Sequence, residues 1–273
     1  MKIDWLIEKA LQEDLGTGDI TSNYLNLDNN KSIAFLIAKE KGILAGLDVA
    51  IEVFRKLDPN ITWVAYKRDG DKLRKGDEII KFNGSTRAIL AGERVALNFI
   101  QRLSGIATIT REMVDILKPY NTKLLDTRKT TPLLRELEKY AVKIGGGYNH
   151  RFGLYDMIML KDNHIQAAGS ITKAVNQVRK HNLNYKIEVE VKNLQELREA
   201  YNCRVDRIML DNMSLKSICK AVALFGGKVE LEVSGGVNLT NIKKYAETGV
   251  QYISAGFITH SAKALDISLL FRE

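Results

Sequence analysis

From about residue 105 onward the chain alternates short apolar segments with amphipathic ones. The apolar segments have the length of buried strands, and the amphipathic ones carry apolar residues at helical spacing. Strands that alternate with helices pair in parallel and place the helices outside the sheet. The predicted strands are residues 123–126, 157–160, 187–191, 207–211, 229–233 and 252–255. The predicted helices are residues 132–142, 170–181, 194–201, 214–224 and 241–248.

Polar residues or glycines follow each predicted strand. From Lys161 on they recur at intervals of 21 to 29 residues (161 to 190, 190 to 211, 211 to 234, 234 to 255), about one strand–helix unit each. An open sheet and a barrel both fit the alternation, but in a barrel the carboxyl ends of all strands converge on one mouth. The recurrence therefore favours an α/β fold with an incomplete or irregular (β/α) barrel, since six units are fewer than the eight of the standard closed barrel. The strand-end residues are Asp126, Thr127, Arg128, Lys129, Lys161, Asp162, Asn163, His164, Glu190, Asp211, Asn212, Ser234, Gly235, Gly236, Ala255, Gly256 and Phe257.

The first hundred residues predict a second, smaller region of mixed α and β structure. Alternating or apolar stretches at 33–38, 61–66 and 78–82 are typical of strands, and an amphipathic helix precedes Pro59. A further helix is predicted over 92–103, and Ser104-Gly105 is expected to break it. This break is the expected boundary between domains 1–104 and 105–273.

The charge balance indicates an anionic partner. Lysine and arginine number 41 against 33 acidic residues, a net charge of +8, which suits nucleic acid, a membrane surface or a small polyanion. The densest basic stretch, 67–75, is diluted by acidic residues, so a nucleic-acid partner is not expected.

Membrane insertion and secretion are not expected either. The apolar runs are all shorter than the 18 residues that a span needs, and the first residues lack a secretory apolar stretch. The two cysteines, Cys203 and Cys219, are too few for a disulfide framework. The expected location is the reducing cytoplasm.

If the strand ends meet, their cations form one cluster. Arg128, Lys129 and Lys161 would share the mouth with Arg151, which follows His150 in the loop before the second strand. Gathering several cations is costly unless anions neutralise them, and arginine suits carboxylate and phosphate groups. A multiply anionic ligand is therefore expected.

Two further patterns refine the ligand. The glycine-containing turns Ser234-Gly235-Gly236 and Ala255-Gly256-Phe257 follow the last two strands, where barrels often hold a phosphate. Glu190 and Asp211 are carboxylates among cations, and Mg²⁺ prefers one or two carboxylates together with phosphate oxygens. The residues predict a phosphate ester, a magnesium-bound polyphosphate and a carboxylate co-substrate.

Each signal has a simpler structural explanation. Glu190 could lie on an exposed strand face, and Asp211 could cap the next helix. Arg128 and Lys129 could belong to a solvated loop, and a Gly-Gly pair is often only a turn. His150 and His164 could bind zinc, although they lack metal-ligand spacing.

Several longer motifs resemble the quinolinate phosphoribosyltransferase family. Matches cover nearly the whole chain and follow the family's order. One departure is Leu133, where the family often has glycine after the proline. The matching segments are residues 13–16, 18–21, 93–98, 103–108, 126–132, 138–142, 145–151, 161–164, 190, 210–212, 234–236 and 259–261.

The resemblance implies a decarboxylating phosphoribosyltransferase of NAD biosynthesis. Such an enzyme converts quinolinate and phosphoribosyl pyrophosphate to nicotinate mononucleotide, pyrophosphate and CO₂. The resemblance also implies an N-terminal α/β sandwich domain, residues 1–104, and a C-terminal barrel-like catalytic domain, residues 105–273. The C-terminal domain would be an open, irregular (β/α) barrel of about six or seven units. It implies Mg²⁺ bound with the phosphoribosyl pyrophosphate and no organic cofactor. The assembly would be a homodimer or a trimer of dimers, in which one subunit's N-terminal domain covers the partner's barrel mouth.

The resemblance also suggests residue roles. Glu190 and Asp211 would hold magnesium and lie near the ribose, with Lys129 and Lys161 on anionic substrate oxygens as further catalytic groups. Arg94 would reach the neighbouring subunit's site. Arg128, His150 and Arg151 would bind the quinolinate carboxylates together with Lys161, and Thr127 would be a further substrate-binding residue. The residues around the 5′-phosphate would be Ser234, Gly235, Gly236, Ala255, Gly256 and Phe257.

Two alternatives to this function stay open at the level of sequence. One is a paralogue of the same fold, associated with molybdenum-transport operons, that acts on another substrate. The other is a basic nucleic-acid-binding protein, whose binding would weaken steeply with salt.

Overall fold

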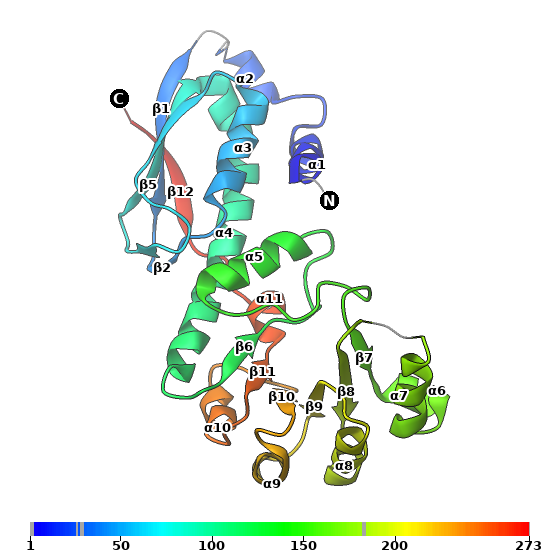
Figure 1. The fold of residues 1–273 in the computed structure, drawn as a ribbon. Helices are drawn as coiled ribbons and strands as arrows, with labels where there is room; N and C mark the ends of the chain where they lie inside the picture. Colours follow the sequence, from blue (N-terminus) through cyan, green and yellow to red (C-terminus); the bar gives the residue numbers. More distant parts are fainter. Residues whose placement is uncertain (1–2, 26, 28–29, 182–183, 273) are drawn as a thin grey trace. The chain divides into compact units, whose positions relative to one another are not determined.

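The computed structural model describes residues 3–25, 27, 30–181 and 184–272. Its contacts divide the chain into two compact units, one of residues 1–109 with 262–273 and the other of residues 110–261. Each unit has its own sheet (Figure 1). This confirms the two-domain α/β fold class. The domain boundary predicted at 104 and 105 stays a prediction, and the last twelve residues of the chain, 262–273, cluster with the first unit.

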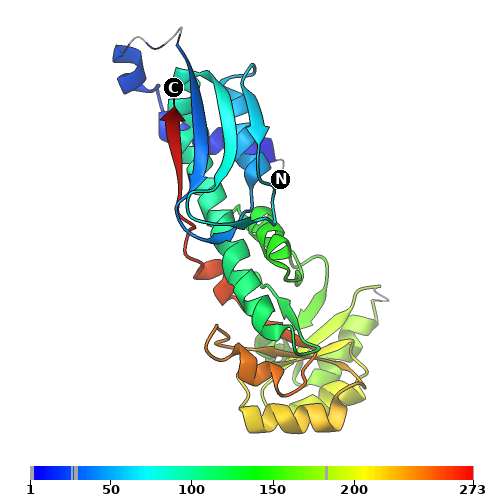
Figure 2. The ribbon, with the colours of Figure 1, turned by 90° about the vertical axis from the view of Figure 1, so that its left-hand side faces the viewer.

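The first unit contains a four-stranded antiparallel sheet in the order β12-β1-β5-β3. The sequence did not suggest β12, which comes from the end of the chain and pairs with β1 from Ile33 opposite Arg272 to Ala38 opposite Ile267. Figures 1 and 2 both show these two strands side by side. The strands of this unit are β1 (Lys31–Ala38), β2 (Gly42–Ile43), β3 (Thr62–Ala65), β4 (Lys72–Leu73), β5 (Glu78–Ser85) and β12 (Ile267–Arg272).

The described helices that begin in this unit are α1 (Ile3–Leu15), α2 (Ile20–Tyr24), α3 (Leu47–Leu57) and α4 (Thr86–Leu117). Apolar spacing makes α3 amphipathic, and its buried Phe54 packs on Phe82 of β5 with ring centroids 4.6 Å apart. The predicted end of α3 before Pro59 is confirmed. Within the described residues, no helix has both the length and the apolar character needed to cross a membrane.

The predicted break in α4 is wrong, because the helix continues through Ser104 and Gly105. Both residues serve close packing instead. The Ser104 hydroxyl bonds the Ala45 backbone N–H at 3.0 Å, and a Cβ on Gly105 would lie 2.0 Å from the Lys263 carbonyl oxygen. Small residues inside a helix can therefore mark a close neighbour rather than an end.

The second unit is built on six parallel strands in the order β6-β11-β10-β9-β8-β7. The sheet is open, with β6 and β7 at its edges, and a single parallel bridge joins Leu125 to Tyr148. Each predicted strand is present with its ends within one residue. The strands are β6 (Lys123–Leu125), β7 (Ile158–Leu160), β8 (Ile187–Val191), β9 (Arg207–Asp211), β10 (Glu230–Ser234) and β11 (Tyr252–Ser254).

The helices of this unit follow its strands, and α8, α9 and α10 lie outside the sheet (Figure 1). Three of these helices begin at side-chain N-caps, since Ser170, Asn193 and Ser214 accept backbone N–H groups of the next turn. The sequence did not suggest α6 and α11. The helices are α5 (Arg135–Gly145), α6 (Asp162–Ala168), α7 (Ile171–Arg179), α8 (Leu194–Asn202), α9 (Leu215–Phe225), α10 (Ile242–Ala246) and α11 (Phe257–His260).

The start predicted for α5 is wrong. Pro132 was expected at the first helical position, but α5 begins at Arg135. Leu133 has φ +67°, in the left-handed region, and helical geometry cannot pass through such a residue. This is also the position at which the resembling family often has glycine, the residue that tolerates this conformation.

Candidate active site

The second unit contains a cavity of about 810 Å³ at the carboxyl ends of its strands. The cavity brings together residues that lie far apart in the sequence, as the barrel prediction requires. Among the predicted site residues, those that line it are Thr127, Arg128, Lys129, His150, Arg151, Lys161, Glu190, Asp211, Ser234, Gly235, Gly236, Gly256 and Phe257.

Two predicted residues lie elsewhere. Ala255 is only 1% exposed and packs in the interior directly after β11. Arg94 lies on α4 in the first unit, where it is exposed, so its expected contact with a neighbouring subunit stays a prediction.

The sequence reasoning also missed part of the lining. Met159 and Met209 lie inside strands, two residues before the polar ends Lys161 and Asp211, and period-two alternation from those two ends could have found them. Ser254 could also have been found from the sequence, because it directly precedes the predicted turn Ala255-Gly256-Phe257. Asn212, one of the predicted strand-end residues, also lines the cavity. The lining residues that the sequence reasoning missed are Met159, Met209, Val237, Asn238, Ser254 and His260.

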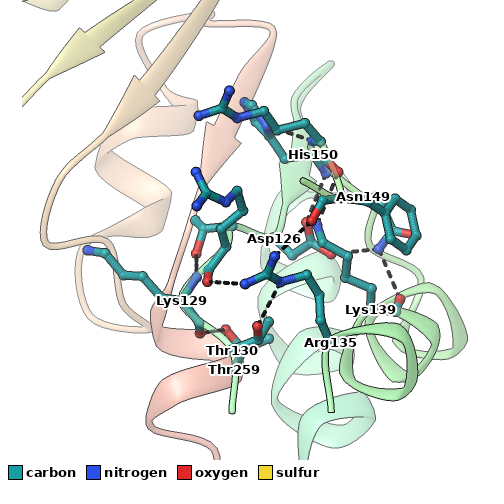
Figure 3. Close-up of polar contacts among 12 residues, drawn as sticks. Asp126, Lys129, Thr130, Arg135, Lys139, Asn149, His150 and Thr259 are labelled. Atoms are coloured by element: carbon teal, nitrogen blue, oxygen red, sulfur yellow. Dashed lines mark hydrogen bonds and ion pairs between the residues drawn. The ribbon is translucent and has the colours of Figure 1, made fainter. Parts of the chain in front are cut away.

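The loop after β6 is fixed from both sides. Arg135 of α5 donates to the Thr130 hydroxyl at 3.0 Å, and the Thr259 hydroxyl donates to the Lys129 carbonyl at 2.7 Å (Figure 3). The Lys129 N–H also donates to the Thr127 hydroxyl at 3.0 Å. The loop is therefore held in place by its neighbours, and its cations are presented from a fixed backbone.

Lys161 and Glu190 form an ion pair across two neighbouring strand ends. Lys161 Nζ lies 2.9 Å from Glu190 Oε2, and the side chains are 43% and 11% exposed. Glu190 is thus not on an exposed strand face. His164 is used locally, because its Nδ1 accepts the Lys161 N–H at 3.1 Å at the start of α6.

Asp211 ends β9, the strand next to β8. The alternative that it caps the next helix is wrong, because Ser214 is the N-cap of α9. Its carboxylate accepts Asn212 Nδ2 at 2.8 Å and lines the same cavity as Glu190. Two carboxylates on adjacent strand ends fit a Mg²⁺ ion that also binds phosphate oxygens.

The turn after β10 needs its glycine. Gly235 has φ +106°, and a Cβ there would lie 2.1 Å from the Asn212 side-chain oxygen. The Gly236 carbonyl accepts a hydrogen bond from Asn241 Nδ2 at 2.9 Å, which holds the turn in place. Because residues 235 and 236 are both glycines, no side chain covers the backbone of the turn where it lines the cavity.

Four ionisable groups lie close together at the base of the cavity: His150 of the lining, and three residues of the sheet, Glu188 of β8, Arg207 of β9 and Glu232 of β10. Glu188 and Glu232 are fully buried, and His150 Nε2 lies 3.0 Å from Glu188 Oε2 and 3.6 Å from Glu232 Oε2. Arg207 Nη1 approaches Glu232 to 3.1 Å. His150, Glu188 and Glu232 could together hold a metal ion. That grouping differs from the zinc alternative, which paired His150 with His164.

The same surroundings set the proton affinities. Burial and then the charge of Glu188 raise the pKa of Glu232 to about 7. Burial opposes protonation of His150, but the contact with Glu188 and the charge of Glu232 outweigh it and raise the pKa of the imidazole. Burial also opposes the charge on Arg207, while Glu232 and Glu188 raise its pKa.

Arg151 is held close to a second cation. Its Nη1 donates to the Met157 carbonyl at 3.1 Å. Burial and then the charge of Arg128 lower the pKa of its guanidinium. Two neighbouring guanidinium groups on one cavity wall favour an anion with more than one carboxylate or phosphate group.

Comparison with protein-family models matches residues 19–104 to the N-terminal domain and residues 106–270 to the C-terminal domain of quinolinate phosphoribosyl transferase. A Bacillus subtilis (strain 168) protein named "probable nicotinate-nucleotide pyrophosphorylase (carboxylating)" is 48% identical over 98% of this chain and 93% of its own. An Arabidopsis thaliana chloroplastic protein, named nicotinate-nucleotide pyrophosphorylase (carboxylating), is 44% identical over 97% of this chain and 81% of its own.

Solved structures agree with these matches. NadC from Streptococcus pyogenes has 45% identity and a TM-score of 0.95, covering 100% of this chain and 98% of that one. The nicotinate-nucleotide pyrophosphorylase from Francisella tularensis has 46% identity and a TM-score of 0.95, covering 99% and 96%. Because both family models match and relatives align along nearly the full length, this chain belongs to the quinolinate phosphoribosyltransferase family.

Proposed function

We propose that the chain is a carboxylating nicotinate-nucleotide pyrophosphorylase of NAD biosynthesis. It joins quinolinate to the ribose of phosphoribosyl pyrophosphate and releases pyrophosphate and CO₂, leaving nicotinate mononucleotide. The observation that supports this most strongly is the single cavity lined by Arg128, Lys129, Arg151 and Lys161 together with Glu190 and Asp211. Such a lining suits a dicarboxylate beside a magnesium-bound polyphosphate.

The first step is transfer of the phosphoribosyl group. The quinolinate nitrogen forms a bond to C1 of the ribose while the bond from C1 to the pyrophosphate oxygen breaks, and pyrophosphate leaves with the electron pair. Glu190 and Asp211 would hold the magnesium that enters with the phosphoribosyl pyrophosphate, which would neutralise the leaving pyrophosphate, and the two carboxylates would stabilise the cationic sugar. Lys129 and Lys161 bind anionic oxygens of the two substrates, so these residues mainly position and neutralise charge.

The second step is decarboxylation of the alkylated ring. The bond from ring C2 to its carboxylate breaks, CO₂ leaves, and the electron pair stays on C2 next to the positive nitrogen until a proton replaces CO₂. Arg128, His150 and Arg151, with Lys161, hold the quinolinate side. The turns 234–236 and 255–257 hold the 5′-phosphate, through backbone groups that glycine leaves accessible.

The proposed working form is a cytoplasmic homodimer, alone or as a trimer of dimers. Arg94 would enter the partner subunit's cavity and add a cation to the quinolinate side. An exposed arginine on a long helix suits this role because its guanidinium forms paired hydrogen bonds with carboxylates.

The test is a turnover assay with quinolinate labelled at the C2 carboxylate. Purified protein should release labelled CO₂ only when phosphoribosyl pyrophosphate and Mg²⁺ are both present. Absence of release under these conditions would refute the activity. Turnover of a different pyridine or pyrimidine acid would favour the same-fold paralogue, and salt-sensitive RNA or DNA binding without ligand competition would favour the nucleic-acid alternative.

A further inference from the structure

A fully buried ion pair contacts the segment that carries His150 and Arg151. Asp126 directly follows β6 and Lys139 lies in α5, and both side chains are 0% exposed. Withdrawing two charges from water costs about as much as their attraction returns, so an apolar pair of similar size is often equally stable. Stability alone therefore does not explain why charged residues occupy these positions.

The ion pair binds the His150 peptide at both ends. The His150 N–H donates to Asp126 Oδ1 at 2.8 Å, and Lys139 Nζ donates to the His150 carbonyl at 3.0 Å. Asn149 adds two bonds, with Nδ2 at 2.6 Å from Asp126 Oδ2 and 2.9 Å from the Lys139 carbonyl. Figure 3 shows these contacts converging on Asp126 and Lys139.

The segment needs such support because it has no regular structure of its own. Residues 149–157 lie between α5 and β7, outside any helix or strand. Buried backbone N–H and C=O groups must find partners, which a ladder or a helix would otherwise supply. An acid and a base side by side provide an acceptor and a donor at once, whereas an apolar pair would provide neither.

We propose that Asp126 and Lys139 are positioning residues, which fix the His150 backbone and thereby place the Arg151 guanidinium for a substrate carboxylate. The Arg151 N–H donates to His150 Nδ1 at 2.8 Å, so the two residues form one fixed unit. Both line the cavity, while Asp126 and Lys139 lie behind them. The inference rests on the proposed function, because it assigns the carboxylate side of that site.

The test is the double variant Asp126→Asn/Lys139→Met, which removes both charges and keeps the side-chain sizes. It leaves no unpaired buried charge, and it releases the His150 carbonyl. We expect the KM for quinolinate to rise about tenfold or more, because displaced binding groups lose much of their effect. The KM for phosphoribosyl pyrophosphate should stay within about twofold, since most of the groups assigned to it (Glu190, Asp211 and the turns 234–236 and 255–257) lie at the ends of strands β8 to β11 and not of β6.

Thr122→Val is the matched control. Thr122 is a buried residue just before β6, at the other end of the strand from Asp126, and its hydroxyl bonds the Val250 carbonyl at 2.7 Å. This variant should lose stability but keep both KM values. An unchanged quinolinate KM in the folded double variant would overturn the proposal, as would an equal rise in both KM values.

Amide hydrogen exchange of the wild-type protein is a second test of the proposal, and it needs no variant. The His150 amide should exchange as slowly as amides of the buried strands, although it lies in an irregular segment. Fast exchange of the His150 amide would overturn the proposal that Asp126 and Lys139 fix the His150 backbone, even if the double variant does not fold. If this amide exchanges slowly but the wild-type protein does not turn over quinolinate, the proposed function fails while the role of Asp126 and Lys139 in fixing the backbone stands.

Discussion

At the scale of single residues, the cavity carries more positive than negative charge. Arg128, Lys129, Arg151 and Lys161 outnumber Glu190 and Asp211 by two. The Lys161–Glu190 pair shows how part of this charge is neutralised within the chain. The remaining cations are available for an anionic substrate, and so their removal should affect the reaction more than the fold.

Replacing Lys129 with Ala should therefore lower kcat/KM by about 10²-fold or more, which is about 2.7 kcal/mol of transition-state stabilisation. The same loss is expected for Glu190→Ala, because the magnesium-bound pyrophosphate would lose a ligand. Steady-state CO₂ release measures both. Lys216→Ala, an exposed lysine in α9, serves as the charge control and should keep full activity. A near-normal rate for Lys129→Ala would contradict its assigned role.

A non-glycine residue in the left-handed region costs about 1–2 kcal/mol, which Leu133→Gly should remove. The greater freedom of glycine in the unfolded chain offsets part of this gain, so the expected net stabilisation is about 1 kcal/mol. The side chain is 60% exposed, so little packing is lost. Urea unfolding followed by circular dichroism measures the change, and a clear loss of stability would show that Leu133 is not strained.

Glu232 should make stability depend on pH. Its folded pKa of about 7 exceeds the ordinary value of 4.5, so the folded state holds more protons between these values. The free energy of unfolding should therefore fall as pH rises through this window, and the raised pKa of His150 acts in the same direction up to its own folded value.

Glu232→Gln cannot release this proton, so its unfolding midpoint should vary less between about pH 5 and about pH 8. Thermal unfolding across the pH series compares it with the wild type. Parallel pH profiles for the two proteins would contradict the raised pKa.

Residue identity was predictable where a residue follows a strand, and much less so elsewhere. Glu190 and Asp211 were found because parallel strands end together at one mouth. Met159 and Met209 were missed because an apolar strand residue resembles a core residue unless the alternation is counted back from the polar strand end. The Asp126–Lys139 pair was missed because nothing in the spacing predicts which loop the lysine of α5 supports.

At the scale of elements, the alternation of apolar and amphipathic segments predicted the strands of the second unit, and the residues at helix starts predicted where several helices begin. Prediction from sequence failed where one residue type suits two different structural roles. Ser104 and Gly105 resemble a helix end, yet they lie within α4 because other segments of the first unit pack closely there. Pro132 suits a helix start, but the conformation of Leu133 delays α5 to Arg135.

Gly105→Ala tests this explanation of α4. In an ordinary helix interior the change stabilises by about 1 kcal/mol. Here the new Cβ would meet the Lys263 carbonyl, so a net loss of about 1–3 kcal/mol is expected. Urea unfolding of the variant and the wild type shows whether the free energy of unfolding rises or falls. A stabilised variant would contradict the close approach.

At the scale of the whole molecule, the pairing of β12 with β1 could not be foreseen. It joins residues more than two hundred positions apart, and no local pattern encodes such a partner. The presence of two units, by contrast, followed from the change in pattern near residue 105. The homodimer with shared sites is a prediction from the family resemblance alone, and mixing two inactive variants tests it.

Arg94→Ala and Lys161→Ala proteins should each be nearly inactive alone. Mixed under conditions of subunit exchange, they should recover about a quarter of wild-type activity, because each hybrid dimer would contain one intact shared site. Mass spectrometry of tagged subunits verifies exchange. Exchange without recovery would show that Arg94 does not act across subunits.

One cavity is proposed to bind a dicarboxylate beside a magnesium-bound phosphoribosyl pyrophosphate and to couple transfer to decarboxylation. Magnetic resonance of a single reaction with labelled quinolinate tests this coupling, because it counts the carbon and phosphorus products together. We expect one nicotinate mononucleotide, one pyrophosphate and one CO₂ for each quinolinate consumed. Pyrophosphate release without CO₂, or CO₂ release without the nucleotide, would contradict a coupled reaction in one cavity.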